Sequence, residues 1–203
     1  MVKLSKLFGF FIGLALLVSL ASAKAPAAKP AAATTKSAVA ATVMPENVID
    51  DMSAAPAGWI KERDKGTTIT LAAGKGQKGK ALEISYSLGD EATWLGVRKK
   101  IRRDISKYKG IRFAVRGEGS SNSIEVKLEN ADYSNFGIVL PVKSNTSEWS
   151  DVEIPFADFE YLWGDSNEVN LLKPLIHITI VKKESDDEGG AGKFVIDQIE
   201  LYK

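Results

Sequence analysis

Few side chains in this sequence could do catalytic chemistry, and those few lack partners. His177 is the only histidine among 203 residues and cysteine is absent, so a zinc site would lack a second histidine and no thiol nucleophile exists. No G-x-S-x-G segment, which would place a nucleophilic serine on a sharp turn, occurs. Asp and Glu are numerous, but no spacing singles out a pair that could cleave a glycosidic bond. We therefore predict no catalytic residues and a protein that is not an enzyme.

Aromatic residues outside the predicted core are better candidates for a functional site. Trp94 lies opposite the apolar face of its predicted strand, Tyr133 lies in a polar loop, and Tyr161 and Trp163 adjoin a Gly-Asp turn. Flat rings on a rigid sheet can stack on sugar faces while polar neighbours bond the hydroxyl groups. The predicted carbohydrate-binding residues are Trp94, Arg98, Asp132, Tyr133, Tyr161, Trp163 and His177. The alternative for each ring is that it only covers the edge of a sheet.

Three aspartates form a candidate metal site. Asp50 and Asp51 lie near the start of the predicted domain, and Asp197 interrupts an apolar strand near its end. An acid is costly to bury without a partner, and the spacing of Ile196 and Ile199 predicts a β-bulge at Asp197. The first and last strands of a sandwich often lie side by side, so one prediction is a calcium ion bound here by carboxylates and backbone carbonyls. The alternative is that Asp197 is only hydrogen-bonded at the bulge.

The elements that must position these residues are predicted to be β-strands. Apolar and polar residues alternate with a period of two, and each run is bounded by Gly, Pro, Asn, Asp or Ser. The runs are residues 82–86, 111–115, 124–128, 152–156, 176–180 and 194–201. Successive strand side chains point to opposite faces, so this alternation is typical of half-buried strands. Many short strands separated by turns predict an all-β sandwich or barrel.

The same alternation separates a predicted core from a predicted outer face. The core positions are Leu95, Val97, Ile111, Phe113, Val115, Ile124, Val126, Leu128, Val152, Ile154, Ile178 and Ile180. Their neighbours along the strands must face outward: Trp94, Arg98, Arg112, Lys127, Glu129, His177 and Thr179. Three of the predicted binding residues, Trp94, Arg98 and His177, are among these outward-facing positions.

The N-terminal residues predict export. Lys3 and Lys6, the apolar run 7–20 and the small residues Ala21-Ser22-Ala23 are typical of a secretory signal peptide over residues 1–23. The apolar run is short for a spanning helix, and an N-terminal membrane anchor is the alternative. We therefore predict a secreted or periplasmic protein with no stable membrane insertion after signal cleavage.

The rest of the chain divides into a linker and one domain. Residues 24–42 are rich in Ala, Pro and Thr and contain no acid, which predicts a disordered linker. Residues 43–203 are numerous enough to bury a core of their own. The formal net charge of +1 argues against a general nucleic-acid-binding protein, for which a strong basic excess is expected.

Four segments resemble carbohydrate-binding modules with the galactose-binding-like jelly roll. Val48–Met52 is similar to the opening φ-I-D-D-F, and Asp104–Gly119 to D-L-S-x-Y-x-G-I-x-F-x-V-x-G-D-G. Trp149–Phe159 is similar to W-x-x-V-x-I-P-F-x-D-F, and Phe194–Leu201 to the closing F-x-I-D-x-I-x-L. The segments follow the family's order and are closest to the family-eleven type of β-glucan-binding module. They also resemble the complex I intermediate-associated family of assembly factors.

The resemblance implies a fold, a function and a metal. The fold is a jelly-roll β-sandwich over residues 43–203. The function is that of an exported, non-catalytic carbohydrate-binding module whose partner is a β-glucan-type polysaccharide. A structural calcium ion near Asp50, Asp51 and Asp197 is also implied. The assembly-factor family implies the alternative, an envelope assembly or scaffold protein that binds another envelope protein.

Overall fold

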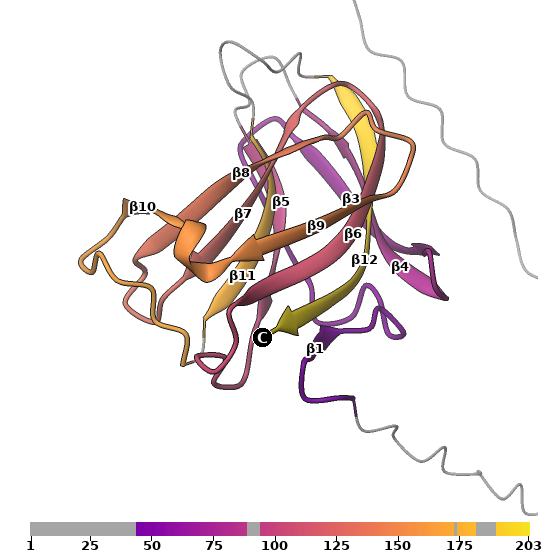
Figure 1. Cartoon of the computed structure of the whole chain (residues 1–203). Helices are drawn as coiled ribbons and strands as arrows, with labels where there is room; N and C mark the ends of the chain where they lie inside the picture. The colour runs from indigo at the N-terminus through magenta and orange to yellow at the C-terminus, as the bar shows by residue number, and fades with distance from the viewer. Residues whose placement is uncertain (1–43, 89–93, 173, 182–189) are drawn as a thin grey trace, which may run out of the picture. The chain divides into compact units, whose positions relative to one another are not determined.

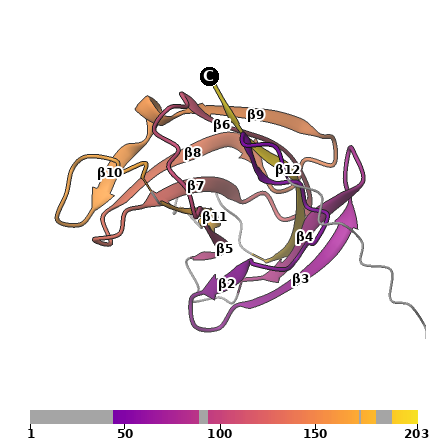
Figure 2. The ribbon, with the colours of Figure 1, turned by 90° about the horizontal axis from the view of Figure 1, so that it is seen from below.

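Two six-stranded antiparallel sheets pack face to face in this computed structural model, which describes residues 44–88, 94–172, 174–181 and 190–203. The first sheet has the order β3 (Thr68–Lys75), β4 (Lys80–Ser87), β12 (Ala191–Tyr202), β6 (Gly110–Gly119) and β9 (Ser150–Pro155), and β1 (Val48–Asp50) pairs with β12. The second sheet has the order β10 (Glu160–Trp163), β8 (Asn135–Lys143), β7 (Ser123–Glu129), β11 (Leu175–Val181), β5 (Trp94–Lys100) and β2 (Ile60–Arg63). Figures 1 and 2 show the two layers, with the chain crossing between them several times.

The core lies between the two sheets and follows the predicted alternation. The predicted core residues Leu95, Val97, Ile111, Phe113, Val115, Ile124, Val126, Leu128, Val152 and Ile154 are all buried. They come from both layers, so the two sheets pack through their apolar faces. The side chains of Ile178, Thr179 and Ile180 lie outside the described residues. The all-β prediction is confirmed.

The predicted β-bulge is present in β12. The pairing of β12 with β6 shifts register between Asp197 and Glu200, and Gln198 has a φ of 38°. The shift lets Ile196 and Ile199 both point into the core although they are three residues apart. The first strand also lies beside the last one, as expected, because Val48 pairs with Glu200.

Two loops at one end of the second sheet are tied together. The Asn130 side-chain amide donates to the carbonyl oxygen of Glu168 at 2.9 Å, and the Ser166 N–H donates to Ser134 Oγ at 2.8 Å. Gly164, with φ of 126°, permits the close approach, because a Cβ there would lie 2.3 Å from the Cα atom of Ser134. These contacts hold the segments that carry two of the candidate aromatic residues.

A short helix and a strand follow β9 in the chain. A short 3-10 helix, η1 (Phe156–Asp158), is followed by strand β10, which extends the second sheet beyond β8. The predicted signal peptide (residues 1–23) and linker (residues 24–42) lie outside the described residues. Within the described ranges, no helix has the length and apolar character needed to cross a membrane.

Candidate functional site

The outer face of the second sheet carries a row of polar side chains. Arg98 of β5 is in register with His177 of β11, and His177 is in register with Lys127 of β7. The three residues therefore lie side by side on adjacent strands, about 5 Å apart. We call this surface the second-sheet face and define it by Glu62, Arg98, Glu125, Lys127, Glu129, Trp163 and His177.

Close contacts among charged and polar side chains connect four strands. Glu62 of β2 lies with one carboxylate oxygen 3.0 Å from Arg98 Nε and with the other 3.1 Å from His177 Nδ1. The second ring nitrogen of His177 lies 3.0 Å from Glu129 Oε2 on β7. The imidazole ring thus lies between two carboxylates. Nδ1 hydrogen-bonds with Glu62, whereas Nε2 has no hydrogen-bond partner among the described residues.

An aromatic ring lies next to this row of side chains, toward the β10 edge of the second sheet. The Lys127 ammonium group lies 5.2 Å from the centroid of the Trp163 ring and 2.9 Å from Glu125 Oε2. Trp163 is 52% exposed, so a large part of its surface is free to contact a ligand. Gly137 of β8 permits this packing, because a Cβ there would lie 2.8 Å from Leu162 Cδ1. The face therefore combines a ring for stacking with charged donors and acceptors.

The structure brings some predicted site residues together and separates others. Arg98, His177 and Trp163 all belong to the second-sheet face. Trp94 is half-buried at the start of β5. Tyr133 is 75% exposed at the tip of the loop between β7 and β8, where it has a positive φ of 65°.

Two of the predicted ligand residues have local structural partners. The Ser134 N–H donates to Asp132 Oδ1 at 3.0 Å, and hydrogen bonds from Ser134 lower the pKa of Asp132 below its ordinary value. Asp132 thus closes a turn. The Tyr161 hydroxyl donates to the Gly164 carbonyl, and its ring meets the edge of Phe136 at 5.8 Å between centroids. Both residues shape the loops that flank Trp163.

Two predicted outward residues face away from the core but are not exposed. His177 is 7% exposed and Glu129 is 9% exposed, because each covers the other and Glu62 covers the far side of the ring. The exposure of an outward-facing residue depends on the side chains of the neighbouring strands. The alternation within one strand gives no information about those neighbours.

Sequence reasoning missed four members of the face as ligand candidates. Lys127 and Glu129 were recognised only as outward-facing, and neither Glu62 nor Glu125 was singled out. The alternation in β7 could have added Glu125, Lys127 and Glu129. Glu62 lies in the four-residue strand β2, and only the pairing of β2 with β5 places it beside Arg98.

We expect the stability of the protein to fall in mild acid because of His177. Burial lowers the pKa of His177 below its ordinary value of 6.5, and the carboxylates of Glu62 and Glu129 oppose that shift. The unfolded chain therefore binds the proton more readily than the folded one. This stability contribution is present above about pH 6.5 and is lost as the pH falls through the lowered pKa.

Urea unfolding of the wild type and His177→Gln at pH 7.5 and pH 5.5 measures this effect. The wild type should lose stability relative to the variant on acidification, by at most about 1.4 kcal/mol per pH unit. Arg98 also faces the ring and works in the same direction, since its charge disfavours an imidazolium. A gain of wild-type stability over the variant in acid would show that the two carboxylates outweigh burial.

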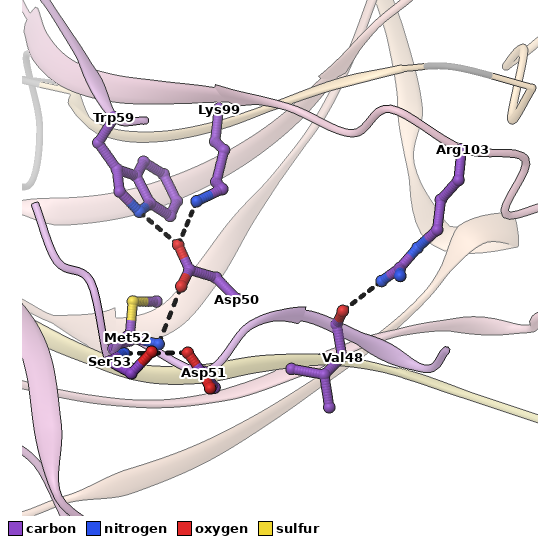
Figure 3. A network of polar contacts seen from close by, with 8 residues as sticks. All are labelled: Val48, Asp50, Asp51, Met52, Ser53, Trp59, Lys99 and Arg103. Carbon is purple, nitrogen blue, oxygen red and sulfur yellow. Dashed lines mark hydrogen bonds and ion pairs between the residues drawn. The ribbon is translucent and has the colours of Figure 1, made fainter. Parts of the chain in front are cut away.

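The residues present do not fit one calcium ion bound by all three predicted aspartates. Asp50 is buried and accepts hydrogen bonds from the Met52 N–H at 2.9 Å and from Trp59 Nε1 at 2.8 Å, and it pairs with the Lys99 ammonium group (Figure 3). An ammonium group already supplies the positive charge at this carboxylate. Asp51 is exposed and accepts from the Ser53 N–H at 3.0 Å.

Asp197 lies on the other side of its strand from the core and accepts the Lys78 N–H at 3.0 Å. Among the residues that the structure describes, no three Asp, Glu, His or Cys side chains come close enough to hold a metal ion. Calcium binding therefore stays an untested prediction, and no step of the proposed function depends on it.

The fold is an antiparallel β-sandwich, and its second-sheet face is polar with an exposed aromatic ring at one edge. Residues 29–203 match the sequence profile of the carbohydrate binding domain (family 11). The match covers most of the chain, which belongs to this family of carbohydrate-binding modules. A comparison with curated proteins found no match.

Solved structures show the same jelly-roll fold. A family 11 carbohydrate-binding module from Clostridium thermocellum, in complex with a β-1,3-1,4-mixed-linked tetrasaccharide, has a TM-score of 0.64 at 22% identity, over 77% of this chain and 94% of its own. The family 11 module of the cellulosomal cellulase Lic26A-Cel5E from the same organism has a TM-score of 0.62 at 20% identity, over 79% of this chain and 96% of its own. The predicted jelly-roll sandwich is confirmed by these likenesses.

Proposed function

We propose that this chain is an exported, non-catalytic module that binds a β-glucan of mixed 1,3 and 1,4 linkage on its second-sheet face. Family membership over residues 29–203 and the tetrasaccharide complex of a structural relative support the ligand class. The predicted signal peptide supports export to the periplasm or the medium. The observation that carries the location of the site is the exposed Trp163 ring beside the ion-pair ladder.

Each group on the face has a role in this proposal. The Trp163 ring stacks on a sugar face, as aromatic rings do on apolar C–H surfaces. Arg98 and Lys127 donate to sugar oxygens, and Glu62 and Glu125 accept from hydroxyl groups. His177 is buried and acts as a positioning residue that holds Glu62 and Glu129. Positive and negative charges nearly balance on the face, which suits a neutral glycan.

The ion pairs contribute by holding side chains in place before the ligand arrives. A flexible glycan loses conformational freedom on binding, and its hydroxyl groups are desolvated, so binding to an exposed face should be weak. Preorganised side chains lower that cost because their rotamers are already restricted.

Removal of the exposed ring should weaken binding. We expect Trp163→Ala to lower affinity for mixed-linkage β-glucan about tenfold or more, since buried aromatic anchors commonly contribute about 1.4 kcal/mol or more. Affinity electrophoresis in gels that contain the glucan measures the retardation of each variant. Circular dichroism checks that the fold is retained.

Trp149→Ala is the matched control. Trp149 is half-buried, packs against Arg116 of β6 and lies beside the first sheet, away from the proposed site. The Trp149→Ala variant should be retarded by the glucan as strongly as the wild type. If the wild type migrates freely on every polysaccharide tested and instead retains an envelope protein, the scaffold function replaces this proposal.

A further inference from the structure

Strand β3 forms one edge of the first sheet, and no other described strand pairs with its outer side. It is eight residues long and pairs with β4 along its whole length, without a register shift. Figure 2 shows β3 at the outside of the sandwich, next to β4. The outer side of an edge strand presents a row of backbone N–H and C=O groups that can pair with another strand, and proteins usually protect such edges.

The other edge strands carry the usual protection. Strands β2 and β10 are only four residues long. Strand β9 contains Asp151 and Glu153 and ends at Pro155, which has no N–H to donate. Strand β3 has none of these features, because residues 66–74 contain neither a charged residue nor a proline and the pairing with β4 has no bulge. The sequence of β3 therefore favours pairing with a further strand.

The core-facing side of β3 is also incompletely covered. Leu71 and Ala73 are in register with Ile84 and Leu82 of β4, and both of these partners are fully buried in the core. Residues in register lie on the same side of a sheet, so Leu71 and Ala73 face the core as well. Leu71 is nevertheless only half-buried, and Ala73 is exposed. A further strand beside β3 would remove both apolar side chains from water.

The sequence of β3 is complementary to itself when two copies pair antiparallel about Leu71. This register places Leu71 opposite Leu71 of the second copy, and Ile69 opposite Ala73. Core-facing residues thus meet core-facing residues, and a large side chain meets a small one. A shift by one residue would instead place core-facing residues opposite outward-facing ones.

The same register brings no like charges together. On the outward side Thr70 lies opposite Ala72 of the second copy, and both residues are exposed in the single chain. Lys75, the only charged residue of β3, lies opposite Thr67. Like charges directly opposite each other destabilise strand pairs, so their absence favours a second copy of this chain as the partner of β3.

We propose that this chain forms a homodimer in which two β3 strands pair antiparallel and join the two first sheets into one continuous sheet. The contact is the same on both copies and occupies the exposed edge of each, so the assembly closes at two copies. The two-fold axis is perpendicular to the joined sheet, because the core-facing sides of both copies remain on one side of it. The second-sheet faces of the two copies therefore point in the same direction.

The dimer would make glucan binding bivalent. This consequence rests on the proposed function, whereas the dimer itself does not. Two faces that point the same way can bind two stretches of one long polysaccharide, and the second contact is then intramolecular. Such linkage raises the overall affinity for a long chain without any new contact to the sugar.

Sedimentation velocity of the chain without its predicted signal peptide tests the dimer. Concentrations from about 1 to 500 μM are suitable, because a small interface gives weak association. The wild type should change from monomer to dimer within this range. Thr70→Lys with Ala72→Lys should raise the dissociation constant about tenfold or more, since each new lysine faces a lysine of the second copy. Thr70→Glu with Ala72→Lys should restore the dimer, since each glutamate then faces a lysine.

Asp151→Asn with Glu153→Gln is the matched control. It changes the net charge by the same amount as the two lysines, but at the opposite edge of the first sheet, and should leave the dimer unchanged. The lysine variant should also bind a mixed-linkage tetrasaccharide as the wild type does, yet lose about tenfold or more in affinity for the long glucan. Thr70 and Ala72 are exposed, so these variants should fold, and circular dichroism checks this.

A wild type that remains monomeric over the whole range would overturn the proposal. A dimer that the two lysines do not weaken, or that the Glu–Lys combination does not restore, would overturn it as well. Slow hydrogen exchange of the β3 amides in a monomer would mean that another segment of the same chain covers the edge, which also contradicts the dimer. An intact dimer that binds no glucan would overturn the proposed function alone.

Discussion

Phe113→Ala should destabilise the folded protein by about 3–5 kcal/mol, the usual range for Phe truncation in a core. Phe113 is 3% exposed in β6, which lies between β12 and β9 in the first sheet, and its ring belongs to the core between the two layers. Truncation leaves a cavity that the surrounding strands can only partly close. Urea unfolding followed by tryptophan fluorescence measures the change.

Ile60→Ala is the matched control for this truncation. Ile60 also lies in a strand but is 54% exposed, so its removal should change stability by less than about 1 kcal/mol. Phe113→Leu, which retains most of the volume, should fall between the two and remains measurable if Phe113→Ala does not fold. A Phe113→Ala protein as stable as the wild type would mean that the register of β6 is off by one residue.

Lys99→Met should destabilise the protein by about 3 kcal/mol, because it leaves the Asp50 carboxylate buried without its cation. The Lys99 ammonium group pairs with Asp50 and lies 5.5 Å from the centroid of the Trp59 ring, so the substitution removes two favourable contacts (Figure 3). Trp59 Nε1 and the Met52 N–H still donate to Asp50, but they do not neutralise it. Thermal or urea unfolding at pH 7 measures the loss.

A double-mutant cycle and a surface pair serve as controls. The double variant Asp50→Asn with Lys99→Met should lose less stability than the sum of the two single variants, because no unpaired charge remains. Lys107→Met breaks the exposed pair with Glu46 and should cost far less, because water and salt screen an exposed pair. If Lys99→Met matches the effect of Lys107→Met, Asp50 is neutralised by something other than Lys99.

The positions of the strands could be predicted, and so could the residues that face the core or the outside. Both depend on residues that are close together in the sequence. Side chains at Leu95, Val97 and Ile101 are all buried, as the alternation requires. The bulge was also predictable, since two apolar residues separated by a polar pair in β12 can share a face only if the strand gains one residue. Membership of family 11 could be predicted because the framework segments occur in the family's order.

The candidate site was predictable only in part, because its groups come from strands far apart in the chain. Glu62 meets His177 across 115 positions, through the pairing of β2 and β11 with β5. Nothing near Glu62 in sequence indicates a histidine. Likewise, the burial of His177 comes from two acids on other strands, so its outward direction was predicted and its low exposure was not.

The three aspartates show the same division most clearly. By itself the sequence determined that Asp50 lies near the first strand and that Asp197 lies at a bulge, because strand pattern and bulge position depend on local residue spacing. Only the tertiary structure decided that Asp50 turns toward Lys99 and Trp59 while Asp197 turns toward the outer face beside Ala114. The physical reason is that a carboxylate is paired by whatever donor the packing of distant strands brings within about 3 Å of it.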